Sequence, residues 1–147
     1  MDNYRNNIET RLNENNYSFT TFNEPEEFFH FIVKDVGLVK LPIEIFQKKD
    51  SPNISIGSMG IMTDSLLEVY VKLTNLEREN FIEKIMQLLN GFNIPYATPH
   101  DEKSFRISII AQIPLLNFNK KVLIETIESV KNACEKSLGL GTKILQE

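Results

Sequence analysis

Residues 89–138 decide the fold and read LNGFNIPYATPHDEKSFRISIIAQIPLLNFNKKVLIETIESVKNACEKSL. The first half of this stretch predicts a β-hairpin, with a short extended piece over 93–98, a polar turn over 99–103 and a longer second strand. In the second strand apolar residues alternate with polar ones, as expected where one face of a sheet is buried. The apolar set is Phe105, Ile107, Ile109, Ala111 and Ile113.

The second half of the same stretch predicts an amphipathic helix. Pro114 ends the strand, and Asn119 is a residue type that caps helix N-termini. Apolar residues then recur at spacings of four, three and four, which places them on one helical face. They are Leu123, Ile127, Val130 and Cys134. Gly139 and Gly141 are predicted to end the helix.

The first part of the chain predicts a short helix and then strands. Tyr4, Ile8 and Leu12 have helical spacing, and residues 17–22 can be extended. Three strands follow over 28–35, 39–48 and 53–61, and their short connections favour an antiparallel meander. Pro42 has no N–H to donate, which suggests an edge strand or a position facing away from the ladder.

Residues 63–73 fit either a strand or a helix. Alternate residues fit a strand: Leu67, Val69, Val71 and Leu73. A second set fits a helix: Leu66, Leu67, Tyr70 and Leu73. Ser65 with Glu68 matches a capping box and favours the helix. Thr74 with Glu77 is a second capping box, and it begins a helix for which Gly91 is the predicted C-cap.

The predicted fold is therefore a single α+β domain over residues 1–147, with the order α-β-β-β-α-β-β-α and helices packed mainly on one face of an antiparallel sheet. The formal net charge of −4 argues against nucleic-acid and anionic-membrane partners. Cys134 is the single cysteine, so no intrachain disulfide can form. No apolar run approaches the ~18–20 residues that span a bilayer. Because secreted domains more often carry paired cysteines, the single cysteine predicts a cytoplasmic protein.

The residues that could carry chemistry have simpler structural interpretations. His100, Asp101 and Glu102 share one turn, without a second cluster to complete a metal site. His30 lies in a strand, opposite the face of Phe29 and Phe31. We therefore predict no metal, no cofactor and no catalytic residue.

Three further features are also better explained as parts of the fold than as catalytic or binding sites. Cys134 lies on an apolar helical stripe and is expected to be a buried small hydrophobe. Gly57 and Gly60 lack the spacing of a phosphate-binding loop and indicate a bulge or bend. Glu24, Glu26 and Glu27 are expected to form an exposed acidic loop.

One resemblance rests on two segments and the helix that follows them. The helix end IMQLLNGFN (85–93) precedes a short strand and then FRISIIAQIP (105–114), and the next helix carries Asn119 and Ala133-Cys134. This arrangement resembles the second half of the type III secretion chaperone-like and YbjN-like superfamily, in particular its small uncharacterised prokaryotic, chiefly archaeal, members. The predicted element order is similar to that superfamily over nearly the whole chain.

The resemblance implies a non-enzymatic, homodimeric module that binds another polypeptide in a chaperone-like way, and it brings no catalytic residues. The alternative is a small-molecule or nucleotide sensor that uses a pocket between the helices and the sheet. Support for that alternative comes from the Gly57–Gly60 segment and the turn at His100.

Overall fold

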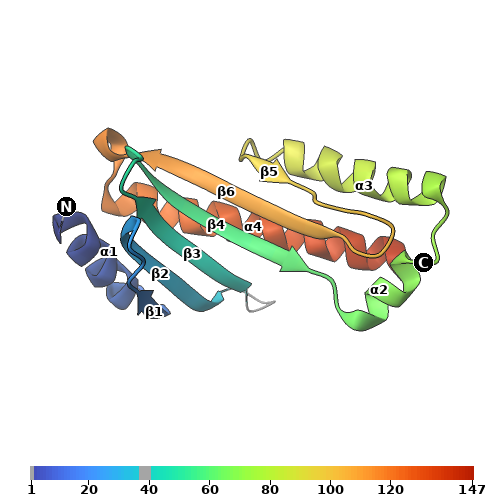
Figure 1. The fold of residues 1–147 in the computed structure, drawn as a ribbon, viewed down its shortest axis with the longest axis horizontal. Coiled ribbons are helices and arrows are strands. Elements are labelled where there is room, and N and C mark those ends of the chain that lie inside the picture. Colours follow the sequence, from blue (N-terminus) through green and yellow to red (C-terminus); the bar gives the residue numbers. More distant parts are fainter. Residues whose placement is uncertain (1, 37–40) are drawn as a thin grey trace.

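The computed structural model describes residues 2–36 and 41–147, and in these residues helices lie beside a six-stranded antiparallel sheet of order β1-β2-β3-β4-β6-β5 (Figure 1). The predicted α+β class is confirmed. The elements in chain order are α1 (Asp2–Glu14), β1 (Ser18–Phe22), β2 (Glu27–Val36), β3 (Leu41–Lys48), β4 (Asn53–Ile61), α2 (Asp64–Tyr70), α3 (Asn75–Asn90), β5 (Tyr96–Ala97), β6 (Arg106–Pro114), a 3₁₀ turn η1 (Leu115–Asn117) and α4 (Lys120–Leu145).

The strands β2, β3 and β4 form the predicted antiparallel meander. Along β3, side chains alternate between the core and the outer face, so that Leu41, Ile43 and Ile45 are buried while Glu44 is exposed. The predicted start of this strand at residues 39–40 lies outside the described residues. Because β3 lies between β2 and β4, the interpretation of Pro42 as an edge-strand residue is wrong.

The closing hairpin is confirmed, although β5 is shorter than the predicted extended piece. β5 pairs with β6 at two positions, and β6 continues beside β4 from Arg106 to Pro114. Ile107, Ile109 and Ile113 point into the core as their alternation predicts. The last strand in the sequence therefore lies next to the centre of the sheet.

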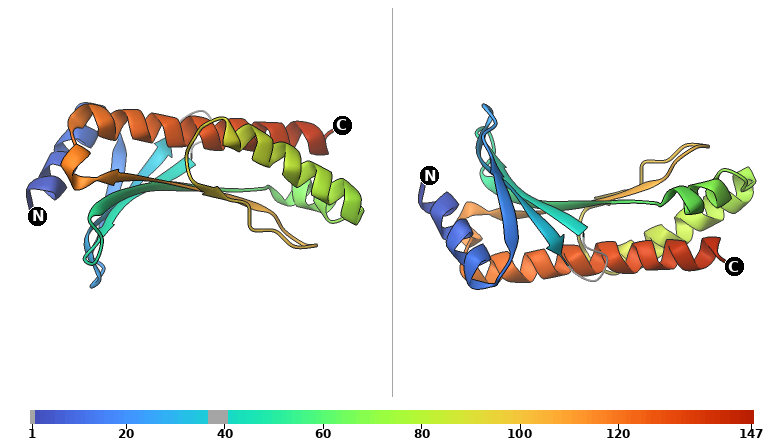
Figure 2. Two further views of the ribbon diagram at one scale, coloured as in Figure 1. Left: turned by 90° about the horizontal axis from the view of Figure 1, so that it is seen from above. Right: turned by 90° about the horizontal axis from the view of Figure 1, so that it is seen from below.

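The helices cover one face of the sheet. Figure 2 shows α4 running along that face in both views, with α1 at one end and α3 at the other, and no helix of the described chain lies over the opposite face. The buried residues of α4 include Leu123, Ile127, Val130 and Cys134, which is the stripe read from the sequence. Packing of this apolar stripe, more than local propensity, stabilises a helix of this kind.

The C-terminal end of α4 differs from the prediction. Gly139 and Gly141 were expected to end the helix, but it continues to Leu145. Gly141 is buried, and a Cβ atom built on it would lie 3.5 Å from the ring of Phe81 in α3. Tertiary contacts thus override the ~1 kcal/mol by which a glycine disfavours a helix.

Two other local predictions also need correction. Gly57 and Gly60 lie in a regular part of β4, each paired with β6 without a register shift, so the predicted bulge is absent there. Residues 63–73 contain a helix, as favoured, but its N-cap is Thr63, whose side chain accepts from the Leu66 N–H, and not Ser65. The Thr74–Glu77 capping box and the Gly91 C-cap are confirmed.

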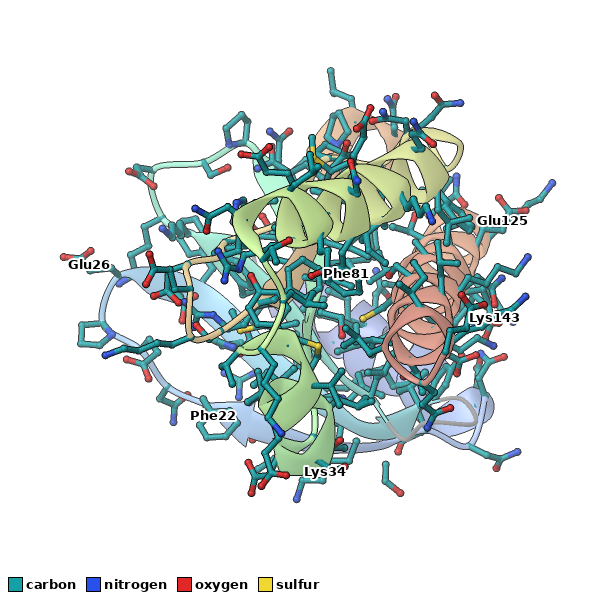
Figure 3. All side chains as sticks on the ribbon, turned by 90° about the vertical axis from the view of Figure 1, so that its right-hand side faces the viewer. Phe22, Glu26, Lys34, Phe81, Glu125 and Lys143 are labelled. Carbon is teal, nitrogen blue, oxygen red and sulfur yellow. The ribbon has the colours of Figure 1, made fainter. Side chains whose placement is uncertain are left out.

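An aromatic cluster joins α2 and α3 to the residue that precedes β6, at one end of the molecule. The ring of Phe81 lies 5.9 Å from that of Tyr70 and 5.1 Å from that of Phe105, measured between centroids. Figure 3 views the molecule from this end and shows Phe81 pointing into the interior, whereas Glu26 and Lys143 point outward. Edge-on contacts of this kind contribute about 0.5–1.5 kcal/mol beyond the area that they bury.

Two glycines should respond to alanine substitution in opposite directions. A Cβ atom at Gly60 would lie 2.9 Å from the side chain of Leu138, so we expect Gly60→Ala to lower the free energy of unfolding by about 1–3 kcal/mol. A Cβ atom at Gly139 meets nothing within 4 Å, so Gly139→Ala should raise it by about 0.5–1 kcal/mol. Urea unfolding followed by circular dichroism measures both, and a stabilised Gly60→Ala variant would contradict the close packing of β4 on α4.

Candidate functional site

The polar residues singled out in the sequence lie apart in the structure. The Asp101 carboxylate accepts N–H bonds from Lys103 (2.7 Å) and Ser104 (2.8 Å), which stabilise its charged form and lower the pKa of Asp101. The Nδ1 atom of the His100 ring lies 2.7 Å from the Thr98 carbonyl oxygen. In the contacts described, this side chain forms hydrogen bonds within its own turn. This segment is a structured turn between β5 and β6.

His30 lies on the outer face of the sheet, opposite Phe29 and Phe31 as predicted. Its Nδ1 is 2.8 Å from a carboxylate oxygen of Glu27, and its ring lies between those of Phe22 and Phe46. Glu24 and Glu26 are exposed, whereas Glu27 is half-buried beside His30. Within the described residues, no three His, Cys, Asp or Glu side chains come together in an arrangement that could hold a metal ion.

Cys134 is buried where α4 faces β4, as predicted. Burial, which disfavours the thiolate, raises the pKa of the Cys134 thiol to about 11, although a hydrogen bond with Ser58 acts in the opposite direction. A nucleophilic cysteine needs a lowered pKa. Cys134 therefore packs as a small apolar residue.

A cavity opens within the sheet where β3 and β4 separate. Glu44, Ile45 and Phe46 pair with Gly57, Ile56 and Ser55. In the same register the next hydrogen-bonded pair would join Pro42 to Met59. Pro42 has no N–H, so this pair cannot form both of its bonds. The Pro42 carbonyl instead accepts a bond from the Ser58 hydroxyl (2.9 Å).

The direction of the peptide groups can be followed from the edge of the sheet inward. Arg106 and Ile110 donate their N–H groups toward the β5 side, to the carbonyls of Pro99 and Pro95. Peptide groups alternate along a strand. The peptide groups of the odd-numbered residues of β6 therefore point toward β4. Those of the odd-numbered residues of β4, including Met59, point toward β3. The peptide group of Met59 is thus directed to the place where the ladder with β3 ends.

The cavity at this place has a volume of about 430 Å³, within the range of ligand-binding pockets. β3 and β4 form its rim, α4 its floor, and the start of α2 and of β6 its far wall. The lining residues are Leu41, Pro42, Met59, Ile61, Met62, Thr63, Leu66, Phe105, Ile107, Ser137, Leu138, Gly141 and Thr142. No charged side chain is among these described residues.

The rim of the cavity carries large apolar side chains in contact with solvent. Met59 is 44% exposed and Ile61 is 63% exposed, both on the face of the sheet opposite α4. The few hydroxyl groups in the lining are partly used within the fold: Ser137 donates to the Ala133 carbonyl oxygen (2.7 Å), and Thr63 caps α2. The site can therefore bind a neutral, apolar group.

The sequence contained one signal for this cavity, namely a proline inside a strand with an otherwise regular alternation. The sequence left two interpretations of Pro42, an edge strand or a position facing away from the ladder, and the strand order excludes the first. The remaining lining residues come from distant elements, and no local pattern connects Ile61 with Thr142.

The fold and this cavity define a mixed α+β protein with an apolar pocket opened within its sheet. The chain belongs to the family described as "Uncharacterized conserved protein (DUF2299)", whose model matches residues 4–139. No curated protein matches it.

A solved structure shares the fold. It is the crystal structure of an uncharacterized protein from Methanothermobacter thermautotrophicus, with a TM-score of 0.84, 20% sequence identity, and coverage of 92% of this chain and 94% of that chain. At this identity the similarity concerns the fold alone. In the part of this chain that the structure describes, no helix is both long enough and apolar enough to cross a membrane.

The pKa of about 11 predicts that the Cys134 thiol of the folded protein reacts very slowly with a thiol-specific disulfide reagent at pH 8. Unfolding in guanidinium should restore the reactivity of an ordinary cysteine, because it removes the burial that raises the pKa. The release of the coloured thiolate measures both rates. Equal rates in the folded and unfolded protein would contradict the buried position of this side chain.

Proposed function

We propose that this protein is a non-enzymatic, chaperone-like module that binds another polypeptide and acts as a homodimer in the cytoplasm. The single observation that carries the proposal is the neutral cavity at the end of the β3–β4 ladder, with Met59 and Ile61 exposed at its rim. Exposed apolar side chains beside a concave apolar surface are typical of interaction sites.

An extended polypeptide segment fits the chemistry of this site. The cavity can take a large apolar side chain, because its lining is apolar and uncharged. Beside it, the peptide group of Met59 faces the side on which Pro42 ends the ladder, so it can bond the backbone of a bound segment. Backbone bonds with a pocket for a side chain are the usual elements of strand-type peptide recognition.

The same site offers little support for catalysis. Its lining contains no His, Asp, Glu, Lys or Cys among the described residues, and a hydroxyl nucleophile needs a base within hydrogen-bond reach. The net charge of −4 also disfavours nucleic acid as the partner. These features favour a protein partner.

Substitution at the rim tests polypeptide binding. The probe is a permanently unfolded, fluorescently labelled model protein, and fluorescence anisotropy measures its dissociation constant. Ile61→Lys should weaken binding by about tenfold or more, because it places a charge where an apolar contact forms. Ile61 is 63% exposed, so the variant should fold normally.

The matched control for this experiment is Leu76→Lys, because Leu76 is 67% exposed on α3 and lies away from the cavity. We expect the control to bind as the wild type does. Equal binding by the wild type and Ile61→Lys would reject the cavity rim as the binding site.

The volume of the cavity favours one alternative, a sensor that binds a neutral apolar small molecule. A nucleotide is disfavoured because no cationic side chain lies among the described lining residues. In a thermal-shift screen, a true ligand at a hundred times its dissociation constant stabilises the fold by about 2.7 kcal/mol. This shift should disappear in Thr142→Phe, which fills the cavity, and a panel without any shift would reject the alternative.

A further inference from the structure

Two of the four methionines of the chain, Met59 and Met62, line the cavity at the end of the β3–β4 ladder. Their exposure to solvent differs. Met59 lies on the open face of the sheet and is 44% exposed, whereas Met62 is 8% exposed. In the described residues no helix covers this face of the sheet (Figure 2). A small solute can therefore reach the Met59 side chain, while Met62 is shielded.

The side chain of Met59 can change its polarity through one chemical step. Its thioether is apolar, unbranched and polarizable, so it adapts to apolar groups of different shape. Hydrogen peroxide oxidises a thioether to a sulfoxide. A sulfur lone pair attacks one peroxide oxygen, and the S–O bond forms as the O–O bond breaks. The departing hydroxide takes the proton of the transferred oxygen and leaves as water, so sulfur loses the two electrons that reduce the peroxide.

At the rim of the cavity this step changes the binding surface rather than the fold. In the free protein the sulfoxide oxygen of residue 59 stays in contact with water, because the side chain is partly exposed. An apolar side chain that enters the cavity covers this oxygen and removes its water. The described lining is apolar and uncharged, so it replaces that water poorly. Oxidation therefore opposes binding without opposing folding.

The other sulfur atoms of the described chain lie elsewhere or are shielded. Met86 on α3 is 39% exposed, close to the value for Met59, but it does not line the cavity. Cys134 is buried, and burial raises the pKa of its thiol to about 11, so the thiolate that reacts with peroxide is scarce. Within the described residues, Met59 is the one exposed sulfur-containing side chain at the cavity.

We propose that Met59 is a modification site, at which oxidation of the thioether to a sulfoxide by a peroxide lowers the affinity of the cavity for polypeptides. The inference rests on the proposed function, because it describes the regulation of that same site. Methionine sulfoxide reductases reverse the step, one enzyme for each sulfoxide epimer. In the reversal two thiols become a disulfide, and the sulfoxide oxygen leaves as water.

Peroxide treatment of the full chain tests the proposal. After the peroxide is removed, fluorescence anisotropy measures binding of the permanently unfolded, labelled model protein, and peptide mass spectrometry measures the sulfoxide at residue 59. We expect the dissociation constant to rise about tenfold or more, because the sulfoxide loses its water on binding. Treatment with both reductases should restore the original value. The circular dichroism spectrum and the thermal unfolding curve should stay unchanged.

Two leucine variants assign the effect to one residue. Met59→Leu removes the reactive sulfur at nearly constant volume, so peroxide should leave the dissociation constant of this variant unchanged. Met86→Leu is the matched control on α3 and should lose affinity after peroxide as the wild type does. Each protein is compared with its own untreated sample, so the starting affinity of Met59→Leu does not affect the result.

Two glutamine variants imitate the polarity of a sulfoxide without any oxidant. Met59→Gln should raise the dissociation constant by about tenfold before peroxide is added, because its amide is covered in the same way. Met86→Gln should bind as the wild type does. Both positions are partly exposed, so both variants should fold normally.

The outcomes separate this inference from the proposed function. If the untreated wild type binds and its Met59 sulfoxide form binds equally well, the regulation is overturned and polypeptide binding is kept. A loss of affinity in peroxide-treated Met59→Leu would assign the effect to another residue and also overturn the inference. A wild type that does not bind before oxidation would overturn both.

Discussion

The packing of α4 against β4 and β6 is the contact on which the rest of the structure depends. It buries the apolar stripe of the helix, and the absence of a side chain at Gly60 allows Leu138 to approach the strand closely. Each buried aliphatic side chain in such a layer contributes about 1.5–3 kcal/mol. The remaining helices attach to this layer, and α3 does so through Phe81, which lies beside Gly141.

One missing N–H determines where the sheet opens into the apolar cavity. Pro42 ends the β3–β4 ladder early, and the Ser58 hydroxyl satisfies its carbonyl, so the strands diverge without leaving that acceptor unpaired. Because α4 continues beneath the gap, the opening has an apolar floor rather than solvent. Helices on one face and a proline inside a central strand together produce a pocket that neither feature would produce alone.

The sequence predicted the elements whose signal is local and strong. Alternation in β6, the Thr74–Glu77 capping box and the Asn119 cap each depend on neighbouring residues, and all are confirmed. The predictions that failed depended on tertiary structure: Gly139 and Gly141 continue a helix because α4 packs on the sheet and on α3, and Pro42 is internal because of the strand order. The cavity combines residues from β3 to α4, so the sequence could not reveal it.

The position of β6 beside β4 has a consequence for the order in which the chain can fold. Asn53 pairs with Pro114, so the centre of the sheet closes only after the intervening helices and β5 have been made. The hairpins β1–β2 and β2–β3 can form from local contacts, but of the helices only α1, at the β1 end, precedes them, and α4 follows much later. Contacts that are distant in sequence slow folding. During synthesis the apolar face of β2 and β3 is therefore not fully covered until almost the last residues of the domain emerge.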